Sequence, residues 1–202
     1  MKETPDILYE DEHLRRTNIS SKAIVTFLIE SEMHYGNKMN STKLVPDIIS
    51  NAKNDIKAAF LRGLADTDFS LTFKKRKTVK CPYHFYPSIV ANFGNESLAH
   101  DAISLIKSLG IYASSCRTGV KRNGKTFLGY SVSVVGKRNL QKWMETICFN
   151  NYKHTTKYDI WDTYGFCPPY TTLKQRNDIL EGNIDLLKEY VVSMEQPLKK
   201  RQ

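Results

Sequence analysis

The chain has 202 residues, of which 41% are hydrophobic and 25% charged, a balance typical of a globular protein rather than a disordered one. No apolar run reaches about 18 residues and none follows the charged N-terminus, so we expect neither a membrane-spanning helix nor a secretory signal. The net charge is +9, and beyond residue 60 there are 22 basic residues against 12 acidic ones, which favours a polyanionic partner such as nucleic acid. The four cysteines have no zinc-site spacing, so we expect reduced thiols in a cytoplasmic protein.

The first patterned segment is the apolar stretch at residues 23–29, which follows two serines suited to cap a helix. It predicts a helix that ends near Gly36. Residues 37–45 are polar and predict a loop, and Pro46 favours a short helix over residues 47–49.

Residues 51–65 carry the strongest helical pattern of the chain. Their apolar positions recur at spacings of three, four and seven, at Ile56, Ala59, Phe60, Gly63 and Leu64. Ala59 and Gly63 lie one turn apart and leave a strip of bare backbone, which permits close contact with a second helix. Ordinary packing in a core explains the same small residues.

Strands and helices alternate beyond residue 68. Alternating apolar residues predict strands at residues 69–76, 84–93, 111–118 and 125–135. Apolar residues at helical spacing predict helices at 95–109, which Gly110 would end, and at 139–148. Basic loops are expected at 77–83 and 119–125, and a final helix at 173–194. The chain is therefore expected to have an α+β fold with an antiparallel sheet.

Each predicted strand has one apolar and one polar face. If helices cover the apolar faces, an open, basic face remains that can contact phosphates and base edges in a DNA groove. We expect basic residues there to bind phosphates and two serines to lie nearer the bases: Lys74, Arg76, Arg117, Lys121, Arg122, Lys125, Ser131 and Ser133.

Residues 60–73, FLRGLADTDFSLTF, open a helix–strand–strand unit and resemble the LAGLIDADG motif of homing endonucleases. The resemblance extends over residues 12–170 and is closest to archaeal and intein-type members, and residues 164–172 are similar to the C-terminal segment of archaeal members. It implies the LAGLIDADG homing-endonuclease fold, αββαββα with a saddle-shaped antiparallel sheet. It also implies site-specific, metal-dependent hydrolysis of phosphodiester bonds in a long double-stranded DNA target.

The resemblance also implies residue roles. Asp68 holds the motif's acidic eighth position, so it is expected to be catalytic and to bind Mg²⁺ near the scissile phosphate, whereas Asp66 is expected to be structural. Phe69 stands where the motif usually has glycine, which is a departure from the family pattern. Ala59 and Gly63 are expected at the interface between two motif helices.

Residues 21–43 resemble residues 136–157, although a helix followed by a basic loop is also common by chance. The paired lysines lie 115, 115 and 114 residues apart, namely Lys22/Lys137, Lys38/Lys153 and Lys43/Lys157. The repeat predicts the tail of a first LAGLIDADG half at 1–50, a complete domain at 51–165, and a C-terminal proline-containing segment and helix at 166–202. The family's lysine near the active site then corresponds to Lys43 and Lys157, both candidate catalytic residues.

The chain holds one acidic motif, whereas double-strand cleavage in this family needs two. The second motif is expected from another copy of the chain, from a separately encoded half or from upstream sequence, unless the chain is an eroded remnant. The leading hypothesis is a Mg²⁺-dependent DNA endonuclease of an intron, intein or free-standing mobile element. The alternatives are a non-cleaving binder, such as an intron RNA maturase or a DNA-binding regulator, and an unrelated basic α+β protein.

Overall fold

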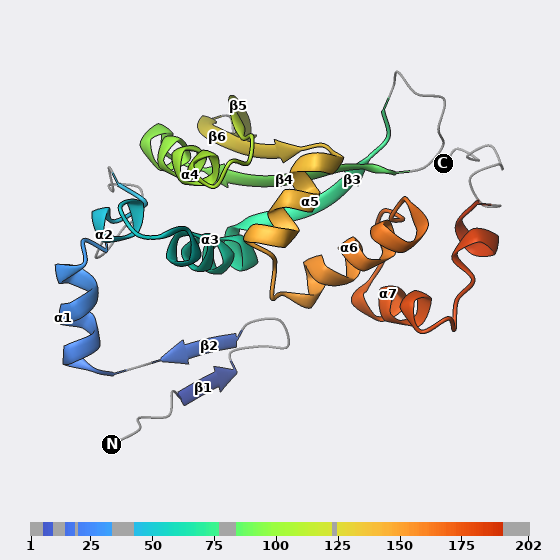
Figure 1. The fold of residues 1–202 in the computed structure, drawn as a ribbon, viewed down its shortest axis with the longest axis horizontal. Coiled ribbons are helices and arrows are strands. Elements are labelled where there is room, and N and C mark those ends of the chain that lie inside the picture. The colour runs from blue at the N-terminus through green and yellow to red at the C-terminus, as the bar shows by residue number, and fades with distance from the viewer. Residues whose placement is uncertain are drawn as a thin grey trace.

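The computed structural model describes residues 6–9, 15–18, 20–33, 43–76, 84–122 and 125–191. The N-terminal part consists of a hairpin of β1 (Asp6–Tyr9) and β2 (Arg15–Asn18), followed by α1 (Lys22–Glu30), and it projects away from the rest of the molecule (Figure 1). Ser21 caps α1 by accepting a hydrogen bond from the backbone N–H of Ile24, as the serine pattern predicts. The helix ends at Glu30, with Ser31 as its C-cap, and therefore before the predicted end near Gly36. Most of the loop expected at 37–45 lies outside the described residues.

The main body follows the short helix α2 (Asp47–Ser50). Its elements are α3 (Asn54–Asp68), β3 (Phe69–Lys74), β4 (Tyr86–Phe93), α4 (Glu96–Ser108), β5 (Ser114–Arg122), β6 (Lys125–Val135) and α5 (Lys137–Thr146). The strands form one antiparallel sheet in the order β3–β4–β6–β5. The predicted α+β class and the αββαββα order are therefore confirmed.

Helices cover one face of this sheet. The covered face carries Leu71 on β3, Ile89 on β4 and Val134 on β6, which are cross-strand neighbours and at most 2% exposed. The ring of Trp143 on α5 lies 5.5 Å from the ring of Phe69, and α4 packs against β4, β5 and β6. The opposite face has a row of smaller side chains, where Ser70 pairs with Val90, Val90 with Ser133, and Ser133 with Ser114.

One edge strand of the sheet is β3, and α6 (Tyr152–Tyr164) covers it. The backbone N–H of Leu71 donates to Nδ1 of His154 at 3.4 Å, and its carbonyl accepts from Nζ of Lys157 at 3.0 Å. Trp161 Nε1 donates to the carbonyl of Phe85, before β4, at 2.8 Å. These contacts satisfy backbone groups that an open edge would leave exposed to other strands.

The structure departs from the sequence predictions in further places. The hairpin from β5 to β6 is longer than predicted, because Arg122 pairs with Lys125 across the short Asn-Gly connection that is typical of tight hairpins. Helix α6 was not predicted, since its buried side chains include the polar residues His154 and Thr156. The final helix is shorter than predicted: α7 (Leu173–Leu180) ends before Gly182, whose φ of 79° lies in the left-handed region, and a π-helical turn follows at Leu187–Val191.

A further difference concerns the face of α3 that packs into the core. The side chains buried from this helix are Ala58, Leu61 and Ala65, so ordinary core packing does not explain Ala59 and Gly63, and their place at an interface between motif helices stays a prediction. Because the buried face of α3 carries small alanines, its sequence pattern is less apolar than that of the uncovered face.

In the described part of the chain, no helix is long and apolar enough to cross a membrane.

Candidate nucleic-acid and metal site

Asp68 ends α3 and lies in an exposed groove of about 430 Å³. Ala59 and Gly63 line this groove on the same helix, and Lys43 lines it from the segment that precedes α2. The structure thus brings together four of the predicted site residues. The Asp68 carboxylate makes no hydrogen bond or ion pair with any described residue, so its oxygens are available to a ligand.

The groove follows the uncovered face of α3. A Cβ added to Gly63 would meet no atom within 4 Å, and Ile56, two turns before it on the same face, is 47% exposed. The remaining lining residues are mostly apolar, at Met33, Leu44, Phe60, Leu64 and Leu98. An exposed helix face with small residues at its centre suits close packing against another helix.

Asp66 differs from Asp68 in its surroundings. Its carboxylate accepts hydrogen bonds from the backbone N–H groups of Asn150 and Asn151, at 3.0 and 3.1 Å, where α6 begins. The Asn151 side chain donates in return to the carbonyl of Asp66 at 3.1 Å. A carboxylate at a helix N-terminus is stabilising, so these contacts support the structural role that the sequence suggested for Asp66.

A sequence profile of the LAGLIDADG-like domain matches residues 55–148, just under half of the chain. The match begins in α3 and ends directly after α5, so it covers the αββαββα unit whose geometry is described above. This unit is a LAGLIDADG domain. The family contains homing endonucleases and maturases. No curated protein matches the chain.

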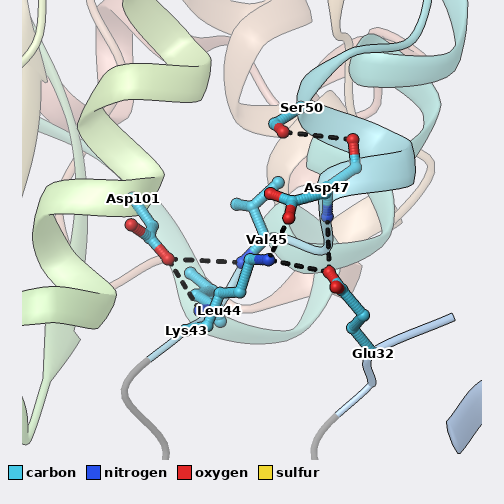
Figure 2. Close-up of polar contacts among 7 residues, drawn as sticks. All are labelled: Glu32, Lys43, Leu44, Val45, Asp47, Ser50 and Asp101. Atoms are coloured by element: carbon cyan, nitrogen blue, oxygen red, sulfur yellow. Dashed lines mark hydrogen bonds and ion pairs between the residues drawn. The ribbon is translucent and has the colours of Figure 1, made fainter.

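Lys43 sits at the N-terminal border of the LAGLIDADG domain, and its amine is paired with two carboxylates (Figure 2). Nζ lies 2.7 Å from Oε2 of Glu32 and 2.8 Å from Oδ2 of Asp47. Hydrogen bonds to Asp47 and then to Glu32 raise the pKa of Lys43, so the amine is a proton donor rather than a base. The next two residues are held by Asp101 of α4, whose Oδ2 accepts from the backbone N–H of Leu44 at 2.8 Å.

Lys157 does not line the groove that contains Asp68 and Lys43. It lies at the outer edge of β3, where it is half-buried and donates to the carbonyl of Leu71. Burial is the main cause that lowers the pKa of Lys157, and the charge of Arg176 is the next. The two lysines that the sequence paired therefore have different surroundings.

The candidate DNA-binding residues divide between the two faces of the sheet. Ser131 and Ser133 lie on the face opposite the helices, and the strand register places Lys74 of β3 on the same face. Arg76 stacks on the ring of Tyr86, with Cζ 4.4 Å from the ring centroid. For Lys121, Arg122 and Lys125 the structure describes the strand pairing but not the side chains.

Arg117 lies on the other face from these serines. It is the cross-strand neighbour of Tyr130, which pairs with the buried Phe93, so it shares the helix-covered face. Its guanidinium donates to the Tyr130 hydroxyl at 3.3 Å and is 5.7 Å from that ring's centroid. The prediction of a single polar face that includes Arg117 is therefore wrong in its geometry, because the strand register sets the parity of each position.

The metal-binding groups around Asp68 fit a metal site shared with DNA and a second motif helix better than a site formed by this chain alone. Among the described residues, no three histidine, cysteine, aspartate or glutamate side chains are grouped so that they could hold a metal ion. Mg²⁺ is commonly held by one or two carboxylates together with water and substrate phosphates. Asp68 supplies one such carboxylate, and DNA and a second motif helix can supply the rest.

Proposed function

We propose that the chain acts in site-specific, metal-dependent hydrolysis of DNA, with Asp68 as its metal-binding catalytic residue. The observation that carries this proposal is the position of Asp68, unpaired within the described chain and exposed at the end of the uncovered α3 helix. A bound divalent metal supplies an activated water and neutralises the leaving oxygen. Asp68 holds one ligand position, while the polar sheet face orients the DNA.

We also propose that the second acidic motif comes from a partner helix packed on Ala59 and Gly63. The single carboxylate of this chain and the open groove beside it support this arrangement. The partner is a second copy of the chain or a separate LAGLIDADG half. In either case the active site is complete only when two motif helices meet.

Lys74, Ser131 and Ser133 are the proposed DNA contacts of the polar face, together with Arg76, which stacks on Tyr86, the cross-strand neighbour of Lys74. Arg117 is on the helix-covered face, so it is not among the proposed contacts of the polar face. Lys43 is proposed to act near the scissile phosphate once DNA competes with its two carboxylate partners. For Lys157, the contact with Leu71 supports a role at the sheet edge.

The test of this function is cleavage by Asp68→Asn. We expect wild type to nick or cut supercoiled DNA containing its target only with Mg²⁺, and Asp68→Asn to lose at least 100-fold in rate while keeping its DNA affinity. The matched control is Asp55→Asn, which removes the same charge from the first turn of α3.

Three outcomes are distinguished. Loss of cleavage in Asp68→Asn but not in Asp55→Asn supports the proposal, and equal rates in Asp68→Asn and wild type contradict it. DNA or RNA binding by wild type with no metal-dependent nicking, at concentrations where the chain is dimeric, identifies a non-cleaving binder instead.

A further inference from the structure

A second cavity, of about 580 Å³, lies at the opposite end of β3 from Asp68. It lies beside the edge of the sheet, between the end of β3, helix α6 and the segment that leads into α7. It shares no lining residue with the groove that contains Asp68. Nothing in the proposed cleavage step uses it.

The lining of this cavity is strongly cationic. Five basic side chains contribute to it and no aspartate or glutamate does, the five being Lys74, Lys75, Lys153, Lys157 and Arg176. Within the described chain, none of the five lies within ion-pair distance of a carboxylate, whereas Lys43 and Lys188 each do. Five cations gathered with no described carboxylate beside them repel one another, and a bound anion would remove that cost.

Arg176 shows that the cavity is built into the fold. Its side chain is 3% exposed, and its guanidinium donates through Nε to the Thr156 hydroxyl at 2.9 Å and through one terminal nitrogen to the carbonyl of Thr171. Both partners are neutral. A buried charge held only by neutral groups is costly, and a planar guanidinium fork fits the oxygens of a phosphate.

Lys157 adds a second partly buried cation beside Arg176. One donor of its amine is used by the Leu71 carbonyl, and the amine still lines the cavity. The neighbouring charge of Arg176 disfavours its protonated form, and an anion between the two would favour it. The site is therefore suited to an anion with several oxygen acceptors.

The cavity adjoins the surface on which nucleic acid is proposed to lie. Thr72 and Lys74 line it and hold the register positions of the polar sheet face, next to Ser70. We infer that this cavity binds a backbone phosphate of the bound DNA, at a site separate from Asp68 and formed by α6, α7 and the end of β3. This inference rests on the proposed function, because it takes the anion to be part of a DNA strand.

The test uses the exposed members of the cluster, since replacing Arg176 risks the fold. The double variant Lys75→Gln/Lys153→Gln removes two lining charges from exposed positions. The matched control is Lys142→Gln, an exposed lysine on α5 that lines none of the cavities described here. The measurement is the slope of log affinity for duplex DNA against log salt concentration.

We expect the double variant to lower the magnitude of this slope by about 1, which corresponds to one lost phosphate contact, and Lys142→Gln to leave it unchanged. An unchanged slope in the double variant overturns the inference. If wild type does not bind DNA, the proposed function fails with it.

A second measurement distinguishes failure of this inference from failure of the proposed function. The thermal unfolding midpoint is measured in inorganic phosphate and in chloride at equal ionic strength. A rise in wild type that the double variant lacks, together with an unchanged DNA slope, shows that the cavity takes phosphate from another source and overturns its assignment to DNA. No rise and no change in slope show that the cavity is not an anion site.

Discussion

His154 is a polar side chain in the apolar interior of the domain. It is 2% exposed, its ring lies 4.8 Å from the ring of Phe149, and Nδ1 accepts the backbone N–H of Leu71. Only an unprotonated Nδ1 can accept this hydrogen bond, so the contact needs the neutral imidazole. The edge of the sheet is thus held by a group whose protonation state depends on pH.

Burial is the largest cause that lowers the pKa of His154 to about 4, and the charges of Lys157 and Lys153 act in the same direction. Asp66 raises the pKa, and Arg176 lowers it to a smaller extent. Between pH 6.5 and 4, the unfolded chain therefore binds a proton at this residue that the folded chain does not. The stability that the neutral imidazole provides is complete above pH 6.5 and is lost as the pH falls toward 4.

We predict that His154→Asn unfolds with a weaker pH dependence than wild type. Asparagine can still accept the Leu71 N–H but cannot titrate, so wild type should lose about 3 kcal/mol more than the variant between pH 7 and pH 4. Urea unfolding at several pH values measures this. His100→Asn, at an exposed position on α4, should follow wild type. Parallel curves for wild type and His154→Asn would contradict the neutral, buried imidazole.

At the level of residues, the sequence could predict those site residues whose position depends only on spacing along the chain. Asp66 and Asp68 have fixed positions in a helix-terminal motif, and the structure gives them the distinct surroundings described above. The surroundings of Lys157 could not be predicted, because they depend on Leu71 and Arg176, which are 86 residues before it and 19 after it in the chain. The cationic cavity was missed for the same reason.

Among the elements, α3 has two faces with different functions. One face carries Ala58, Leu61 and Ala65 into the core. The other carries Ala59 and Gly63, which no described element covers. The sequence pattern predicted that the second face is apolar with small residues at its centre, but local spacing could not show which face meets the sheet.

We predict that Gly63→Leu folds normally but does not pair. A side chain at this position meets open space in the monomer, so the unfolding midpoint should be unchanged or higher. Leucine would nevertheless separate two closely packed motif helices, so association and double-strand cleavage should be lost. Sedimentation of the protein with and without DNA measures this.

The matched control is Gly63→Ala, which adds only a methyl group and should keep some association while gaining stability. If wild type is a monomer even on DNA and still makes double-strand breaks, the pairing argument fails.

For the whole molecule, α1 and α5 hold corresponding positions of the predicted repeat but differ in burial. In the repeat of 115 residues, Val25 and Leu28 of α1 correspond to Leu140 and Trp143 of α5. The α5 pair is at most 1% exposed, whereas Val25 and Leu28 are 43% and 40% exposed. No residue of α1 is buried. This difference supports the proposal that α1 belongs to a first LAGLIDADG half and has its core partners there.

The last prediction is that a chain of residues 43–202 keeps the folded LAGLIDADG domain. Among the described contacts, truncation removes the pairing of Glu32 with Lys43 and Asp47, which is exposed, so the unfolding midpoint should fall only slightly. Association through the exposed apolar side chains of α1, such as Ile24 and Phe27, should disappear, whereas association through Ala59 and Gly63 of α3 should remain. The full-length variant Ile24→Ser/Phe27→Ser should lose the same association without truncation. Near-ultraviolet circular dichroism and light scattering measure both effects, and a truncated chain that loses its tertiary signal would instead place α1 in the core of this domain.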